Sequence, residues 1–382
     1  MNNNNIFAEI LNLIQHSLMK TSFYLRTLFL CLLTLTFGCS GSDDSGSGDN
    51  GGGNGGGNNG NTITSISIVA SPTSALVGET ITFTVSGNTG ANLTSQSEIS
   101  VDGNAISGNT FAATAEGTYS IVATYEALTS NTVDLIINIP PLRFNKNVLI
   151  EDYTGAWCGY CPRVSFGIER VEDATDQAVP VAIHRGNASG SNVDPYNFPA
   201  AVLENMIGLT GYPTAMLNRT TEWNYPEPLN TNQVINLTGD DAEIGLAMNS
   251  TLSGSNMSIE VNVKFGEDYS ASDLKLVVYI LEDGLIYNQT NYTSYYGGGS
   301  VIVDFQHDHV LRSCLTDLLG DDIPSAETTD ENVYTRTFDV PVPSNVSNSS
   351  NINVVAFVVG SNNTALNARA ANFGDDQAFE EN

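Results

Sequence analysis

Hydrophobic and polar residues alternate in short runs through the first stretch of this chain that has a regular pattern. Such alternation is typical of half-buried β-strands. The runs lie at residues 63–69, 79–85, 119–125 and 133–139. Several short strands at this spacing predict a β-sandwich over residues 62–140. Pro140 and Pro141 end it, because neither residue can donate a hydrogen bond to a strand ladder.

A second alternating stretch runs from residue 241 to the last residue, 382. Its runs lie at residues 259–265, 274–281, 334–340 and 352–359. The first of these alternates strictly, and the second is almost wholly apolar. We therefore expect a second β-sandwich over residues 241–382.

Residues 141–240 mix strand and helix signals. Apolar residues at 148–150 and 180–184 predict two buried strands, and a helix is expected at 198–207. Another helix is predicted between the two strands, because apolar residues recur there at i, i+4 and i+7, namely Val164, Ile168 and Val171. The chain is thus predicted to be multidomain, with a central α/β domain between two all-β domains.

The amino-terminal segment, residues 1–38, has the order of a secretory signal. Lys20 and Arg26 precede an apolar stretch at 28–37, which is too short for a comfortable transmembrane helix. Residues 35–39 resemble a bacterial lipobox, in which Cys39 becomes the lipidated first residue. Met19 is a candidate for the true start. The alternative interpretation of this segment is a short membrane anchor.

Residues 39–61 are rich in Gly, Asn, Ser and Asp, and we expect a flexible tether because they carry almost no apolar surface to bury. Its start, Ser40–Asp44, resembles the surface-export signal of Bacteroidetes lipoproteins. The formal net charge of the chain is −29, which argues against nucleic acid and anionic lipid as partners. The sequence implies no organic cofactor.

Cysteine spacing supplies the strongest chemical signal. Cys158 and Cys161 form a C-x-x-C motif at the start of the predicted helix. Unpaired N–H groups and the helix dipole favour a thiolate at Cys158, which we expect to be the exposed thiol of the pair. Thiol–disulfide exchange requires such a thiolate. A structural disulfide clip and a zinc half-site are the alternatives, although no second ligand pair completes a zinc site.

The strand, the W-C-x-x-C motif that begins at Trp157 and the helix resemble the active-site unit of the thioredoxin superfamily. Gly211-Tyr212-Pro213-Thr214 resembles the turn that faces the disulfide in that superfamily. The resemblance implies a cis peptide bond at Pro213, with Tyr212 lying across the disulfide. Gly117-Thr118-Tyr119 in the first sandwich resembles the tyrosine corner of immunoglobulin-like (Ig-like) domains.

Two longer motifs, GYPTAMLNR at 211–219 and HDHVLR at 307–312, resemble the outer membrane protein 28-related lipoproteins of Bacteroidetes. This resemblance covers roughly residues 140 to 382. It implies an exported lipoprotein that contains a thioredoxin-like domain.

Asp152 lies five residues before Trp157, at the position of the buried carboxylate that assists proton transfer in thioredoxins. Glu151 beside it should point to the opposite face of the strand. One of the two carboxyls should be buried with a raised pKa. The alternative is that both lie at a frayed strand end in solvent.

The remaining candidates favour structural roles. His307 and His309 lie on one face of an extended segment and are weak candidates for a metal pair. His184 ends its strand and is expected to be a core histidine. Cys314 falls in a stripe of apolar residues that predicts a helix, where its thiol would be buried and inert.

The leading functional hypothesis is an outer membrane, lipid-anchored protein that exchanges disulfides with exported proteins. Cys158 would attack and Cys161 would resolve, while Pro213, Tyr212 and Trp157 shape the approach of the substrate. The alternative is a non-enzymatic surface lipoprotein with a static disulfide, in which the Ig-like domain is a spacer or binding module. The sequence leaves the substrate, the direction of exchange and the side of the membrane open.

Overall fold

The computed structural model describes residues 62–382. The expected signal segment, Cys39 and most of the tether lie outside the described residues. Most regular structure in the described part is β-strand, arranged in several sheets with a few short helices. Within residues 62–382 no helix is long and apolar enough to cross a membrane.

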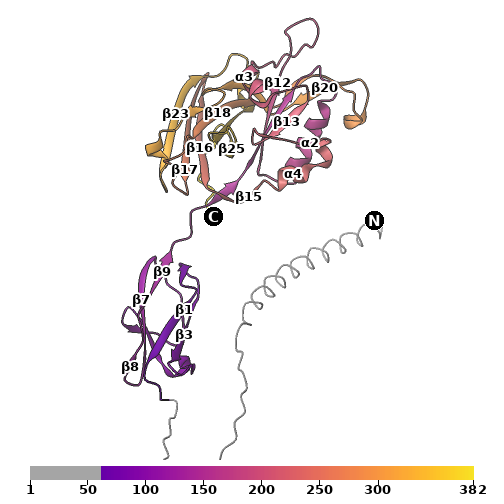
Figure 1. The fold of residues 1–382 in the computed structure, drawn as a ribbon. Coiled ribbons are helices and arrows are strands. Elements are labelled where there is room, and N and C mark those ends of the chain that lie inside the picture. Colours follow the sequence, from indigo (N-terminus) through magenta and orange to yellow (C-terminus); the bar gives the residue numbers. More distant parts are fainter. Residues whose placement is uncertain (1–61) are drawn as a thin grey trace, which may run out of the picture. The chain divides into compact units, whose positions relative to one another are not determined.

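The first β-rich segment folds into two sheets around one apolar core, as the alternating pattern predicts. One sheet has the order β1 (Ile66–Ser71), β3 (Ile81–Gly87) and β6 (Thr110–Phe111). The other has the order β2 (Ser74–Leu76), β9 (Val133–Asn138), β7 (Gly117–Tyr125), β4 (Glu98–Val101) and β5 (Asn104–Ala105), and β8 (Leu128–Thr129) pairs with β7. These strands fill the indigo part of Figure 1. Alternate residues such as Ile68, Phe83 and Leu135 are buried between the sheets.

The tyrosine-corner contact expected in this segment is present. The Tyr119 hydroxyl donates a 2.9 Å hydrogen bond to the carbonyl oxygen of Ala115. This bond ties the start of β7 to the loop that precedes it. The sandwich has no disulfide among its described residues, so its apolar core holds the sheets together.

The predicted α/β segment is built on strand β11 (Val148–Thr154), every residue of which is buried. Strand β12 (Ala178–His184) pairs parallel to β11, and β13 (Thr214–Leu217) pairs antiparallel on its other edge. Helix α2 (Pro162–Glu172) connects β11 to β12 and packs Val164, Ile168 and Val171 against the sheet. Figure 1 shows α2 beside the short helix α4 (Thr231–Ile235).

The same sheet continues into the last third of the chain. Its order is β14-β13-β11-β12-β21-β18-β24-β25, and β22 pairs with β18. The bounds of the added strands are β14 (Thr221–Glu222), β18 (Lys275–Glu282), β21 (Val310–Cys314), β22 (Asp321–Asp322), β24 (Ile352–Val359) and β25 (Ala365–Asn372). The two halves join where β12 and β21 run parallel, at Ala182 opposite Val310. The helix predicted around Cys314 is therefore wrong, because its apolar residues belong to a buried strand and the connection after it.

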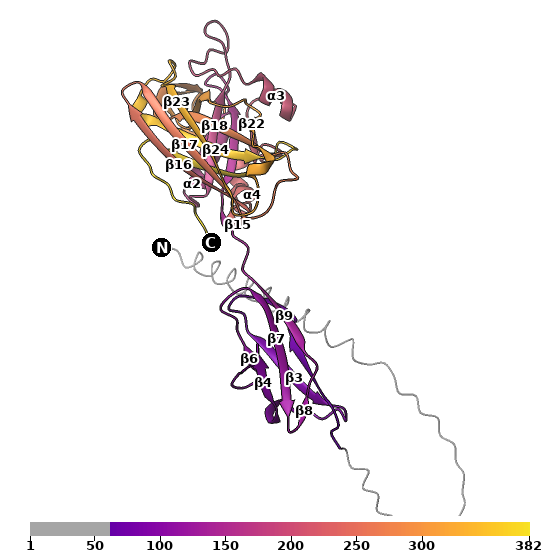
Figure 2. The same cartoon turned by 90° about the vertical axis from the view of Figure 1, so that its left-hand side faces the viewer.

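A further sheet, β16 (Ile244–Ser253), β17 (Asn256–Phe265) and β23 (Val333–Pro341), packs on β18 and β24. Figure 2 shows these strands gathered in one part of the molecule. Residues 241–382 thus form two packed layers, as expected for a sandwich. One of those layers is continuous with the strands of the α/β segment, which the sequence did not indicate.

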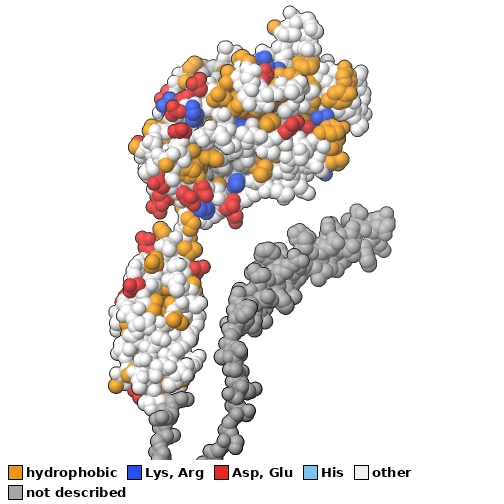
Figure 3. All heavy atoms as spheres, viewed as in Figure 1, with side chains coloured by type: hydrophobic (Ala, Val, Ile, Leu, Met, Phe, Trp, Pro, Cys, Tyr) orange, Lys and Arg blue, Asp and Glu red, His pale blue; other side chains and the backbone are white. Residues whose placement is uncertain are grey.

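Shorter elements complete the fold. Two ribbons are β10 (Phe144–Lys146) with β15 (Gly239–Ala242), and β19 (Leu285–Thr290) with β20 (Val301–His307). Helix α3 (Ala201–Ile207) lies within the expected helix at 198–207, and 3₁₀ turns lie at Thr94–Gln96, Glu227–Leu229, Tyr295–Gly297, Ser325–Glu327 and Ser349–Asn351. On the face drawn in Figure 3 charged side chains are sparse, in keeping with a charged fraction of 14%.

Candidate functional site

The C-x-x-C motif lies where β11 leads into α2, and the two cysteines form a disulfide. The S–S bond is 2.07 Å long and the Cα atoms are 5.4 Å apart. Cys161 immediately precedes the first helical residue, Pro162, whose missing N–H costs nothing at that position. Both cysteines are buried, with 4% of Cys158 and 1% of Cys161 exposed. The expectation that Cys158 would be exposed is therefore wrong for the oxidised state, although it remains the more accessible of the two.

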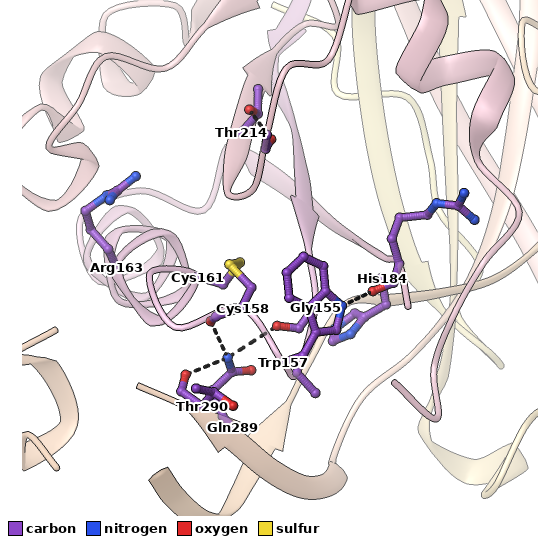
Figure 4. Close-up of a disulfide and its surroundings, with 12 residues drawn as sticks. Gly155, Trp157, Cys158, Cys161, Arg163, His184, Thr214, Gln289 and Thr290 are labelled. Carbon is purple, nitrogen blue, oxygen red and sulfur yellow. Dashed lines mark hydrogen bonds between the residues drawn. A yellow bond between two sulfur atoms is a disulfide. The ribbon is translucent and has the colours of Figure 1, made fainter. Parts of the chain in front are cut away.

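Trp157 and Tyr212 lie together beside this loop. Their ring centroids are 5.6 Å apart in an edge-to-face arrangement, and the Trp157 indole N–H donates to the carbonyl oxygen of Arg185 at 2.6 Å. The Tyr212–Pro213 peptide bond is cis, as the sequence motif implied. Figure 4 shows Thr214, the residue after Pro213, on the strand end across from the disulfide.

Asp152 and Glu151 are both buried in β11, so the alternative of a solvated, frayed strand end is wrong. Asp152 is 2% exposed, and its Oδ1 atom has no hydrogen-bond partner within residues 62–382. Burial raises the pKa of Asp152 well above its usual value, and the carboxylate of Glu227 adds to this while Arg163 opposes it. Asp152 therefore matches the expectation of a buried carboxyl with a raised pKa.

Glu151 points to the other face of β11, where it meets the buried guanidinium of Arg219. The Arg219 Nε atom lies 3.2 Å from the Glu151 carboxylate, and both side chains are fully buried. Arg219 also donates to the Tyr279 hydroxyl at 2.6 Å and to the Leu318 carbonyl at 2.8 Å. This cluster ties β11 to strands of the last third of the chain, which indicates a structural role for Glu151.

Arg163 in the first turn of α2 is a neighbour of the disulfide that sequence reasoning missed. Its Nε atom lies 2.5 Å from the Glu227 carboxylate, and its guanidinium stacks over the Tyr225 ring at 4.6 Å. Tyr225 itself is 74% exposed. The pair therefore places a cation and an accessible aromatic ring near the amino end of α2.

The carboxy-terminal end of β19 packs against the disulfide loop, and no local sequence signal pointed to it. The Gln289 side chain donates to the carbonyl oxygens of Cys158 and Gly155 at 2.9 and 3.3 Å. The backbone N–H of Thr290 donates to Ala156 at 2.9 Å. These contacts join residues that are more than 130 positions apart in the chain.

A small pocket lies beside the loop, among β11, β12, α2 and β20. Residues on its wall include Asp152, Glu169, His184, Gln289, His307 and His309. Burial and the neighbouring ring of His184 lower the pKa of His307 to about 3, so its imidazole is neutral. Its Nε2 atom has no hydrogen-bond partner in the described part of the chain.

The three histidines of this pocket do not form a metal centre. His184 Nδ1 lies 2.9 Å from the Asp194 carboxylate, as suits a core histidine, and His309 Nε2 lies 3.2 Å from Glu172. His307 instead packs against aromatic rings, among them Phe305. Among the described residues no group of three or more His, Cys, Asp or Glu side chains is placed to hold a metal ion.

Residues 200–377 match the family model described as outer membrane protein Omp28, which supports the predicted relation to that family over this part of the chain. The match begins after Cys161, so the disulfide lies outside the matched residues while Gln289 lies within them. No curated protein matches the chain.

Two solved structures from Porphyromonas gingivalis are similar to parts of the chain. HBP35 is 20% identical with a TM-score of 0.49, covering 61% of this chain and 77% of its own. A domain of the outer membrane lipoprotein Omp28 is 18% identical with a TM-score of 0.24, covering 36% of this chain and 92% of its own. Because both TM-scores are below 0.5, neither likeness carries an argument about fold or function.

Proposed function

We propose that this protein is an outer membrane lipoprotein whose thioredoxin-like segment exchanges disulfides with exported proteins. The observation that carries the proposal is the Cys158–Cys161 disulfide at the amino end of α2, with the carboxyl of Asp152 buried nearby. A helix amino terminus stabilises a thiolate there, and a buried carboxyl with a raised pKa can exchange a proton with a cysteine.

The exchange proceeds in two steps. The reduced Cys158 thiolate attacks one sulfur of a substrate disulfide, which forms a mixed disulfide and releases a substrate thiolate. The Cys161 thiolate then attacks the Cys158 sulfur, which closes the protein disulfide and releases the second substrate thiolate. Run in reverse, the oxidised pair accepts two electrons from a substrate dithiol.

The topology around the disulfide supports this assignment. Strand β11 is flanked by the parallel β12 and the antiparallel β13, and α2 crosses between β11 and β12. The cis bond before Pro213 and the Trp157–Tyr212 contact lie next to the loop. Together these features favour a thioredoxin-like active site.

The relation to Omp28 supports the proposed outer membrane location, and the lipobox-like residues that end at Cys39 support the proposed lipid anchor. Replacing Cys39 by Ala should release the protein from membranes into soluble fractions. A Cys39→Ala protein that still sediments with membranes would remove the lipid anchor from the proposal. Cys31→Ala, within the expected signal segment, is the matched control and should leave the fractionation unchanged.

A trapping experiment tests the exchange activity. Cys161→Ala should accumulate mixed disulfides at Cys158 with exported proteins, since the resolving thiol is gone. A Cys314→Ala background excludes the remaining thiol, and Cys158→Ala with Cys161→Ala is the matched control. The reduced protein should also alkylate at Cys158 before Cys161 in mildly acidic solution. A Cys158 that alkylates readily and yet traps no partner would contradict the proposal.

The second candidate is a surface lipoprotein with a static disulfide. The burial of both cysteines and the cover formed by Gln289 favour it. A static disulfide should resist reduction by glutathione in the folded protein, whereas an exchanging pair should equilibrate with it. Trapping and glutathione equilibration together therefore separate the two candidates.

A further inference from the structure

The Gln289 side chain is placed to hold the backbone of the disulfide loop. It is 3% exposed, and its Nε2 atom donates to the carbonyl oxygens of Cys158 at 2.9 Å, Thr290 at 3.0 Å and Gly155 at 3.3 Å. Figure 4 shows all three bonds converging on the amide of this one side chain. Two of the acceptors belong to the disulfide loop, and none is a sulfur atom.

Backbone N–H groups that follow Gln289 make further hydrogen bonds to the disulfide loop. The N–H of Thr290 donates to the Ala156 carbonyl at 2.9 Å, and the N–H of Tyr292 donates to the Gly159 carbonyl at 2.6 Å. The Tyr292 ring also lies so close to Gly159 that a Cβ atom at that position would clash with it. We call residues 289–292 the clamp segment.

The clamp segment is itself fixed in place. Asn291 is 1% exposed and donates to the Tyr295 carbonyl at 3.2 Å. The Tyr295 ring stacks on Phe166 of α2 with centroids 4.8 Å apart, and the Tyr296 hydroxyl donates to Glu169 of the same helix at 2.7 Å. The clamp segment and the helix that follows the disulfide therefore form one packed unit.

We propose that Gln289 is a positioning residue that sets the redox equilibrium of the Cys158–Cys161 pair. This inference rests on the proposed exchange function. The clamp bonds involve backbone carbonyls, so they remain available when the S–S bond is broken. They hold the reduced loop in the geometry that closes the ring, which raises the effective concentration of one thiol at the other and favours the disulfide.

The reference reaction is exchange with glutathione. The protein dithiol and oxidised glutathione give the protein disulfide and two molecules of reduced glutathione, so two electrons and two protons pass to the glutathione. Without the Gln289 donor the reduced loop relaxes and the equilibrium constant for this reaction falls. The relaxed loop lowers the effective concentration of one thiol at the other, and we expect the equilibrium constant to fall by about tenfold. A tenfold change shifts the reduction potential by about 30 mV toward less negative values.

The experiment measures this equilibrium constant in the full chain with Cys314 replaced by Ala. Gln289→Met keeps the length of the side chain and removes the donor, and Gln289→Glu also turns a carboxylate toward the carbonyls. We expect the disulfide to become easier to reduce in the order wild type, Gln289→Met, Gln289→Glu. Gln306→Ala is the matched control, because Gln306 is an exposed glutamine on the paired strand β20 and bonds Asp308 instead.

The outcomes separate this inference from the function on which it rests. A shift in both Gln289 variants with none in Gln306→Ala, in proteins that remain folded in both redox states, supports the positioning role. Equal equilibrium constants with glutathione in wild type and both variants overturn the positioning role. The exchange function stands in that case if Cys161→Ala still traps partners. A wild-type pair that does not equilibrate with glutathione overturns both. If Gln289→Met does not fold, Gln289→Glu alone decides by the same comparison.

Discussion

Replacing Asp152 by Asn should remove a pH-dependent cost of folding. In the folded protein burial holds the pKa of this carboxyl well above the value of 3.8 that applies when the chain is unfolded. Between the two pKa values the folded state binds more protons than the unfolded state does, so rising pH lowers the free energy of unfolding. The contribution of Asp152 is absent below the unfolded pKa and reaches its full destabilising size above the folded one.

The size of the effect follows from linkage. One proton of difference between the folded and unfolded states gives a slope of about 1.4 kcal/mol per pH unit. The free energy of unfolding of Asp152→Asn, minus that of wild type, should therefore grow by up to about this amount per unit. Growth starts near the unfolded pKa of 3.8 and stops at the folded one.

Urea unfolding followed by tryptophan fluorescence suits this measurement. The protein has two tryptophans, Trp157 and Trp223, and both pack around the β11–α2 unit, so the signal reports the region that contains Asp152. Asp176→Asn, at an exposed position just before β12, is the control for removing a carboxylate at the surface. A difference for Asp152→Asn that does not change with pH would refute the argument that its carboxyl is buried at a cost.

Two further substitutions probe the surroundings of the disulfide. Glu151→Ala leaves the buried Arg219 guanidinium without its carboxylate. It should lower the free energy of unfolding by about 3–5 kcal/mol in urea denaturation. A loss below about 1 kcal/mol, typical of an exposed ion pair, would contradict the buried geometry. Gly159→Ala forces a methyl group into the Tyr292 ring and should cost about 1–3 kcal/mol by the same assay. Adding Tyr292→Ala should return part of that loss, and a double variant no more stable than Gly159→Ala would show that the ring is not the obstacle.

Much of the local structure can be predicted from the sequence, because a strand or helix with one buried face repeats its apolar residues at the period of that element. Strand β24 spans Ile352–Val359, the limits of its apolar run, and α2 buries the three residues whose spacing predicted it. Around Cys314 the spacing of apolar residues predicts the wrong element. Its apolar neighbours satisfy a helical spacing, yet they belong to a strand buried on both faces, and strands of that kind lose the alternation that identifies them.

The residues of the candidate site also divide into those that the sequence predicts and those that it does not. Cys158, Cys161, Asp152 and Tyr212 lie near the motif or in a turn with its own signature, so local sequence is enough to nominate them. Gln289 is an ordinary glutamine in an ordinary strand, and only tertiary structure brings its amide to the Cys158 carbonyl. No property of the residue itself distinguishes it from Gln306 on the neighbouring strand.

The distance along the chain between the disulfide and its clamp has a consequence for biogenesis. Gln289 follows Cys158 by 131 residues, and strand β21, which covers the free edge of β12, lies further on still. A chain that emerges with its amino terminus first therefore presents both thiols before the segments that cover them exist. In that interval the pair is uncovered, and completion of the carboxy-terminal strands then lowers the exposed fraction of Cys158 to 4% and that of Cys161 to 1%. The sequence order thus defines an interval during synthesis in which both thiols are more accessible to oxidation than in the folded chain.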